Sequence, residues 1–144
     1  MFSIEQINSA RTNEKGKVKF PEYVREIIKL GVTSYDTYVE DGHTVYHGKN
    51  SYQVVSEAIY ENLSVNNQSD TDQFQHDLKD HQEGNKDYLS FCNDCAKSGV
   101  EKWVIDMASK TCTYFNKAGQ KMYTEKIPTL QEDKQLQGTG GRYS

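Results

Sequence analysis

Apolar residues fall into helical spacing near the start of the chain. The clearest stripe recurs at i, i+3, i+4, i+7 and i+8 and comprises Phe20, Tyr23, Val24, Ile27 and Ile28. This spacing predicts an amphipathic helix with one face on a core, with Pro21 in its first turn and Gly31 as its left-handed cap. A shorter helix is predicted after Ser3, because Ser3 and Gln6 have the spacing of a capping box.

Period-two alternation follows these helices and predicts β-strands. Residues 35–40 and 43–48 flank Asp41 and Gly42, a pair that favours a two-residue type I′ turn because both tolerate positive φ. Residues 52–55 form a third segment of the same kind. The three segments predict an antiparallel meander whose side chains alternate between the two sheet faces.

The same order of elements returns in the second half of the chain. Gly99 stands 68 residues after Gly31, and the same offset places Trp103 on Tyr35. A capping pair and a helical apolar face precede Gly99, as they precede Gly31. A second meander is predicted over residues 102–107, 111–116 and 120–127. This match predicts an internal duplication, although its period is too long for a solenoid repeat.

The expected fold is α+β, an internal duplication of a helix–helix–three-stranded β-meander unit. We expect a largely antiparallel sheet with helices packed on one face. Residues 1–128 are predicted to form a single domain of two repeats, at about 2–55 and 70–127, joined by a linker at 56–69. Residues 129–144 are polar and rich in glycine, and are predicted to form a flexible C-terminal tail.

Composition narrows the class of protein. The 144 residues are 35% hydrophobic and 26% charged, which is typical of a globular domain. A net charge of −4 without a dense Lys/Arg cluster disfavours nucleic-acid binding, because phosphates require positive partners. No apolar run reaches the roughly 20 residues of a membrane span, and the start lacks a signal-peptide layout. Three cysteines, an odd number, point to a reducing compartment, so we expect a soluble cytoplasmic protein without a membrane partner.

Three segments carry a resemblance to a known family: YDTYVEDGHT (35–44), DYLSFCNDC (87–95) and GVEKWVIDM (99–107). They resemble an uncharacterised bacterial family, domain of unknown function 1398, whose members often carry the label "phage envelope protein". The resemblance extends from about residue 2 to residue 128. It implies no reaction, cofactor or catalytic residue, and its label suggests a prophage-derived accessory or structural protein.

Cys92 and Cys95 form a Cys-x-x-Cys motif within the helix predicted just before Gly99. The motif could be half of a zinc site or a dithiol redox pair. No second ligand pair has matching spacing, and both cysteines lie beyond the first helical turn, where the helix dipole no longer favours a thiolate. Their counterparts in the first repeat are Val24 and Ile27, on the apolar stripe. Core packing is therefore favoured, with Cys92 and Cys95 kept as weak metal candidates.

Two histidines follow the predicted turn, beside acidic residues. A two-residue turn pairs Glu40 with His43. It also pairs Asp36 with His47, and Tyr38 lies between the two pairs on the same sheet face. Contacts between histidine and carboxylate beside a tyrosine suit acid–base catalysis or metal binding. A solvated sheet face held by cross-strand pairs has the same pattern, so both interpretations stay open.

Tyrosine is the most unusual feature of the composition, with ten copies against one tryptophan. Six are expected around the first meander: Tyr35, Tyr38, Tyr46, Tyr52, Tyr60 and Tyr88. One interpretation is an aromatic-lined pocket between the two halves, since tyrosine offers both an apolar ring and a polar hydroxyl. The alternative is a core filled by tyrosines whose hydroxyls are hydrogen-bonded.

The leading hypothesis is a non-enzymatic binding or regulatory protein for a small ligand or a protein partner. No nucleophile elbow, phosphate loop, dinucleotide fingerprint or zinc-protease motif is present in the sequence. A second hypothesis is a small enzyme or metalloprotein that uses His43 and His47 with acidic or Cys residues. We predict no cofactor, and we also expect that the chain could form a homodimer. The ligand-binding candidates are Asp36, Tyr38, His43, Tyr46 and His47.

Overall fold

The computed structural model describes residues 1–127, and the predicted tail at 129–144 lies outside them. The α-helices are α1 (Ile4–Ser9), α2 (Phe20–Leu30), α3 (Thr71–Gln82) and α4 (Tyr88–Lys97). The strands are β1 (Thr12–Asn13), β2 (Gly16–Lys17), β3 (Ser34–Tyr38), β4 (Thr44–His47), β5 (Gln53–Val55), β6 (Val100–Asp106), β7 (Thr111–Asn116) and β8 (Lys121–Lys126). A short 3₁₀ turn, Lys49–Ser51, precedes β5.

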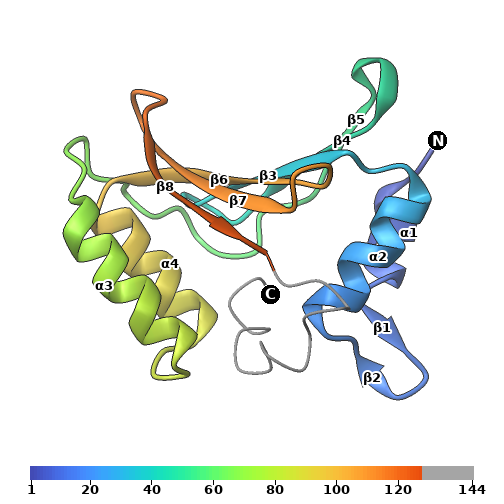
Figure 1. Cartoon of the computed structure of the whole chain (residues 1–144), viewed down its shortest axis with the longest axis horizontal. Helices are drawn as coiled ribbons and strands as arrows, with labels where there is room; N and C mark the ends of the chain where they lie inside the picture. The colour runs from blue at the N-terminus through green and yellow to red at the C-terminus, as the bar shows by residue number, and fades with distance from the viewer. Residues whose placement is uncertain (128–144) are drawn as a thin grey trace.

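Six of the strands form one antiparallel sheet in the order β5-β4-β3-β6-β7-β8, while β1 and β2 form a small separate hairpin. The two helical pairs, α1 with α2 and α3 with α4, lie on the same face of this sheet and near its opposite ends (Figure 1). The α+β class, the antiparallel sheet and the placement of helices on one face are therefore confirmed. Each half supplies two helices and three adjacent strands of the large sheet, and the duplication stays a prediction.

The first strands of the two meanders meet at the centre of the sheet. Tyr35 of β3 lies opposite Ile105 of β6, and Thr37 lies opposite Trp103. Paired residues in an antiparallel ladder point to the same face. The buried positions of the two strands therefore face the helices together, and the sheet carries one continuous core across both halves.

The helix ends follow the capping chemistry of the sequence. The Gln6 amide donates to Ser3 Oγ at 3.2 Å and the Ser3 amide donates to Gln6 Oε1 at 2.8 Å, which completes the predicted capping box. At α3 the Gln73 amide donates to Asp70 Oδ1 at 3.0 Å. Gly31 ends α2 with a φ of +107°, as a left-handed cap requires.

The predicted two-residue turn at residues 41–42 is wrong. Strand β3 ends at Tyr38, and the Gly42 amide donates to the Tyr38 carbonyl at 2.9 Å across a longer loop. Asp36 consequently pairs with Val45 rather than with His47. The register moves by two residues, so every side chain keeps its predicted face.

A long-range contact accounts for this longer loop. The amide of Ile59, in the linker, donates to the Asp41 carbonyl at 2.9 Å. The Tyr60 hydroxyl donates to the Val39 carbonyl at 2.6 Å, and Val39 is buried. A Cβ added to Gly42 would lie 2.4 Å from Ile59 Cγ1, so the linker packs directly on the loop. These hydrogen bonds replace those of the local type I′ turn.

The end of the linker is fixed on the α4–β6 turn. The Asn66 amide donates to the Ala96 carbonyl and the Asp70 amide donates to the Ser98 carbonyl, each at 2.9 Å. Gly99 has a φ of +82°, and a Cβ there would lie 2.6 Å from the Gln68 carbonyl oxygen. A left-handed backbone and a close neighbour both require glycine at this position.

Gly99→Ala should lower the free energy of unfolding by about 3 kcal/mol, because backbone strain adds to a clash with the linker backbone. Gly84→Ala is the matched control, since Gly84 has a φ of +84° and no atom within 4 Å of an added Cβ. The control should lose only about 1 kcal/mol. Urea unfolding of the two variants measures the difference, and equal losses would contradict the packing of the linker on Gly99.

Candidate functional site

A cavity of about 270 Å³ lies on the helix-covered face of the sheet, with Asn8 of α1 and Tyr88 of α4 among its lining residues. Tyr35 and Thr37 of β3 and Thr44 and Tyr46 of β4 form its floor. Its walls come from distant parts of the chain: Arg11 beyond α1, Lys17 of β2, Ser56 and Ile59 of the linker, and Tyr88 at the start of α4. The cavity is therefore a product of both halves and the linker.

Arg11 provides a half-buried positive charge at this cavity. Its Nη2 atom donates to the Tyr46 hydroxyl at 2.9 Å, and its guanidinium carbon lies 4.6 Å from the centre of the Tyr23 ring. The Tyr23 and Tyr46 hydroxyl oxygens are 3.1 Å apart. Within residues 1–127, Arg11 forms no ion pair with a carboxylate. Neutral groups thus surround its charge.

The cavity floor carries hydroxyl groups in different states of hydrogen bonding. Thr37 Oγ1 and Thr44 Oγ1 are 3.0 Å apart, and the Thr44 amide donates to Ser56 Oγ at 2.8 Å. Tyr35 is only 4% exposed, yet its hydroxyl forms no hydrogen bond with another residue of the described range 1–127. Burial raises the pKa of Tyr35, so its hydroxyl stays protonated and keeps a proton to donate.

The predicted ligand-binding residues are divided between the two sheet faces. Tyr46 is 1% exposed and points into the cavity described above. Asp36, Tyr38 and His47 belong to the face away from the helices, and His43 stacks on Tyr38 with ring centres 4.6 Å apart. The structure therefore does not bring the five candidates together.

On the open face, Asp36 is engaged by two basic side chains. Its carboxylate lies 3.4 Å from Lys102 Nζ and 3.6 Å from His47 Nε2. The Lys102 ammonium also lies 5.5 Å from the centre of the Tyr38 ring. These contacts tie β4, β3 and β6 together on the open face.

One group of potential metal ligands is present within the described residues, and it comprises Glu40, Asp41 and His43, whose ligand atoms lie within 4.8 Å of one another. His47 does not belong to it. His43 Nδ1 lies 2.6 Å from Asp41 Oδ1. Burial raises the pKa of Asp41, but hydrogen bonds from the His43 backbone and ring outweigh burial and lower it. The contact therefore already holds the loop without a metal ion.

The cysteines have the environment of core residues. Cys92, Cys95 and Cys112 have no exposed surface. Burial raises the pKa of the Cys92 thiol to about 11, and it also raises that of Cys95. A buried thiol of this kind is a poor nucleophile and a poor metal ligand, because the thiolate is the reactive form.

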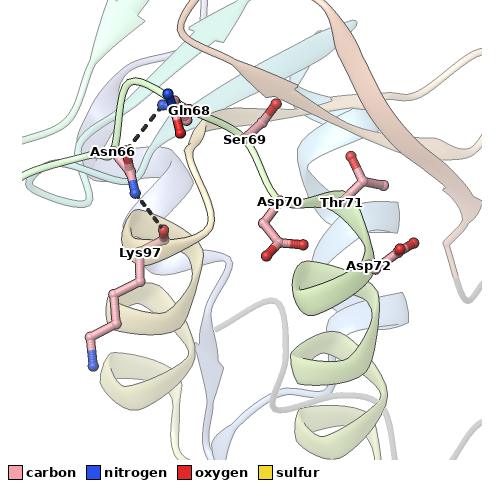
Figure 2. A pocket seen from close by; sticks show the side chains of 7 residues that line it. All are labelled: Asn66, Gln68, Ser69, Asp70, Thr71, Asp72 and Lys97. Carbon is pink, nitrogen blue, oxygen red and sulfur yellow. Dashed lines mark hydrogen bonds between the residues drawn. The ribbon is translucent and has the colours of Figure 1, made fainter.

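A second hollow, of about 380 Å³, lies at the start of α3 (Figure 2). Its polar groups already serve the backbone: Asn66 Nδ2 donates to the Lys97 carbonyl, and Asp70 caps α3. The Lys97 side chain points away from Asp70 and Asp72 in Figure 2. With the helix N-terminus occupied by a carboxylate, this hollow offers no comparable binding chemistry.

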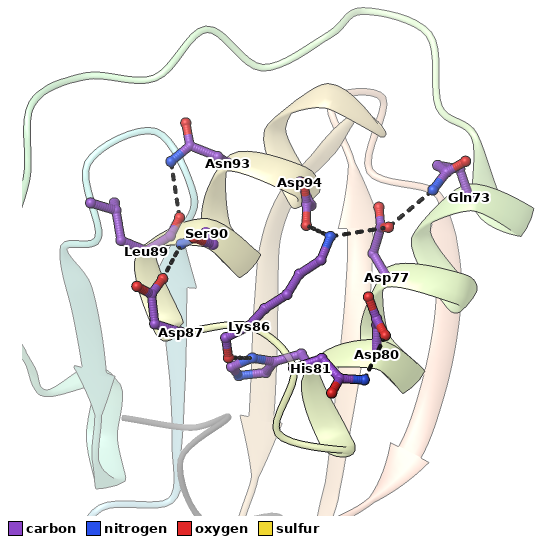
Figure 3. Close-up of polar contacts among 11 residues, drawn as sticks. Gln73, Asp77, Asp80, His81, Lys86, Asp87, Leu89, Ser90, Asn93 and Asp94 are labelled. Carbon is purple, nitrogen blue, oxygen red and sulfur yellow. Dashed lines mark hydrogen bonds and ion pairs between the residues drawn. The ribbon is translucent and has the colours of Figure 1, made fainter.

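A charged cluster joins α3 to α4 (Figure 3). Lys86 Nζ contacts the Asp94 carboxylate and lies 3.7 Å from Asp77 Oδ1. His81 Nδ1 lies 2.8 Å from the Lys86 carbonyl oxygen, and its ring stacks on Phe91 with centres 4.6 Å apart. These contacts hold α3 and α4 together, and none of these residues lines the cavity.

The sequence offered an aromatic-lined pocket between the halves as one of two interpretations, beside a core filled by tyrosines, and it did not single out Arg11. Arg11 directly follows Ala10, the C-cap of α1, where a basic side chain is common, so its residue type gives only a weak signal. Thr37, Thr44 and Ser56 carry no comparable signal. Their alternation indicates a strand face, but only the tertiary structure makes that face the floor of a cavity.

Comparison with known proteins gives one family. A family model described as "Protein of unknown function (DUF1398)" matches residues 8–126. No curated protein matches the chain. Within residues 1–127, no helix is long and apolar enough to cross a membrane.

The burial of the cysteines predicts low reactivity of their thiols in the native protein. In the native protein at pH 8, all three cysteines should resist 5,5′-dithiobis(2-nitrobenzoate), because burial holds Cys92 and Cys95 in the thiol form. Denaturation in guanidinium should release three reactive thiols. Absorbance of the released thiolate follows both reactions.

A Gln75→Cys variant is the positive control, because Gln75 is exposed on α3. It should react at once in the native state, with the other three thiols unchanged. Rapid reaction of a thiol in the native, unsubstituted protein would contradict this prediction. Cys92 and Cys95 would then again be candidates for a redox or metal site.

Proposed function

The chain belongs to the DUF1398 family, whose function is unknown, and we propose that it binds a small molecule in the cavity on the helix-covered face of its sheet without transforming it. The observation that carries this proposal is the cavity itself, which is lined by both halves and by the linker. A concave, partly apolar site with a few convergent polar groups is the usual form of a small-molecule site.

The size and lining of the cavity support a small, partly aromatic ligand. Its volume of about 270 Å³ lies just below the roughly 300–1,000 Å³ usual for larger ligands. Tyr35, Tyr88 and Ile59 supply apolar surface, while Arg11 and Ser56 supply polar contacts. A ligand that stacks on a tyrosine ring and fills the space would gain from both kinds of group.

An exposed side chain of the linker, Ile59, borders the cavity. Ile59 is 60% exposed, which is unusual for an isoleucine that borders an apolar space. Its amide is held by the Asp41 carbonyl, so its side chain stays at the cavity edge. A bound ligand would cover this exposed side chain and gain the free energy of its burial.

Binding without catalysis is favoured by the side chains at the cavity. The described residues that line it include no histidine, cysteine, aspartate or glutamate. Histidine and carboxylates are the most frequent general acids and bases, and a serine or threonine nucleophile needs such a base beside it to be activated. The acid–base alternative would instead use His43 and His47 on the open face, where Asp36 is already paired with Lys102. The buried thiols of Cys92 and Cys95 also support a cytoplasmic location.

A native mass spectrum of the untagged protein, purified from its source without chelator, tests the proposal. We expect an additional mass, of one small molecule per chain, that disappears on denaturation. Asn8→Trp should remove it, because Asn8 is exposed at the cavity edge and the larger ring would occupy the space. A bare polypeptide mass for the unsubstituted protein would contradict the proposal.

Gln75→Trp is the matched control for this substitution. Gln75 is also exposed on a helix, but it does not line the cavity. The control should retain the additional mass in full. If both Trp variants lost it, the effect would come from the added aromatic surface and not from the cavity.

A further inference from the structure

The charge of Arg11 is the feature of the cavity that its protein neighbours do not explain. A guanidinium is protonated at every accessible pH. Its contacts within residues 1–127 are the Tyr46 hydroxyl and the face of the Tyr23 ring, and neither carries a negative charge. Removing a charge from water is unfavourable unless an opposite charge or several hydrogen bonds compensate.

The neighbouring tyrosines do not act as counter-ions. Burial raises the pKa of Tyr23, so its phenol stays neutral at physiological pH. Tyr35 is likewise protonated, and within residues 1–127 its hydroxyl donates to no other residue, although it lines the same cavity. A guanidinium has five N–H donors, and only one bond from Arg11, to Tyr46, is formed with the described side chains. The cavity thus holds an excess of donors.

A second cationic side chain adds to this excess of hydrogen-bond donors in the cavity. Lys17 also lines the cavity, and no acidic side chain of the described chain does. The chain as a whole is acidic, with a net charge of −4, so the positive cavity is a local feature against the overall charge. Such a site attracts anions and disfavours cationic ligands.

From these observations we infer that the ligand of the cavity is a small organic anion whose carboxylate or phosphate oxygens accept hydrogen bonds from Arg11 and Tyr35. This inference rests on the proposed function and names the chemical class of its ligand. The apolar body of the anion lies against Tyr88 and Ile59. Arginine suits carboxylate and phosphate alike, because its planar fork forms two parallel hydrogen bonds with either.

A purely structural role is the competing explanation for Arg11. Its stacking on Tyr23 and its bond to Tyr46 also brace α2 against β4. A brace would affect stability but would not discriminate between charged and neutral ligands. The test therefore has to compare ligands that differ only in charge.

Trp103 provides the signal for this comparison. It is the only tryptophan of the chain, and its ring centre lies 6.3 Å from that of Tyr88, which borders the cavity. A nitroaromatic ligand in the cavity should quench its fluorescence. Three probes of similar shape are titrated: 4-nitrobenzoate, 4-nitrophenyl phosphate and neutral 4-nitrobenzamide.

At least one of the two anions should quench Trp103 saturably and bind about 10-fold or more tightly than the amide, as a charge-assisted hydrogen bond provides. The tighter of the two identifies the head group as carboxylate or phosphate. Arg11→Met should remove the preference for anions, and Arg11→Lys should keep part of it. Arg25→Met is the matched control, because Arg25 is an exposed arginine of α2 that does not line the cavity.

One measurement and one further variant guard against a folding defect of Arg11→Met. Near-ultraviolet circular dichroism shows whether Arg11→Met keeps its native packing. Lys17→Met alters only an exposed side chain, so it should fold normally and weaken anion binding by a few-fold. A preference for anions that both variants retain in full would overturn the inference.

The remaining outcomes separate the inference from the proposed function. If the amide binds as tightly as the anions, the cavity is a ligand site and the inference about charge is wrong. If neither anion quenches saturably, the inference is also wrong, and the native mass spectrum decides independently whether the cavity holds a ligand.

Discussion

The pairing of β3 with β6 is the interaction on which the rest of the structure depends. It joins two three-stranded meanders through their first strands, and each meander alone would expose an unpaired edge at that point. Its register sets Tyr35 opposite Ile105 and Thr37 opposite Trp103, so the buried positions of both halves share one face. Both helical pairs must therefore pack on that face, near opposite ends (Figure 1).

This arrangement explains why the cavity lies where it does and why it is polar at one side. The helical pairs cover the ends of the sheet, and the middle is bordered by loops, the linker and the ends of helices. Loops and helix ends carry polar side chains, so Arg11 and Ser56 reach a floor built of tyrosine and threonine. The open face has different chemistry, because its acidic and basic side chains pair across strands, as Asp36 does with Lys102.

The candidate site was predictable only in part, and particular residues show why. The alternation in β3 and β4 placed Tyr46 on the face opposite Asp36 even though the predicted turn was wrong, because a two-residue slip preserves faces. The slip itself followed from the hydrogen bond between the Ile59 amide and the Asp41 carbonyl. The two residues are 18 positions apart, so the bond leaves no local signal. Arg11 lies just beyond the C-cap of α1, where a basic side chain is common, and its partner Tyr46 is 35 residues away.

By itself, the sequence determined the local elements of this protein: the α2 stripe, the capping pairs Ser3–Gln6 and Asp70–Gln73, and the two meanders with their buried faces. These features depend on backbone hydrogen bonds and side-chain periodicity within a few residues. Only the tertiary structure decided the strand order, the longer loop after Tyr38 and the cavity. Each of these arises where segments far apart in the chain compete for the same hydrogen bonds and the same buried surface, and that competition leaves no periodic pattern in the sequence.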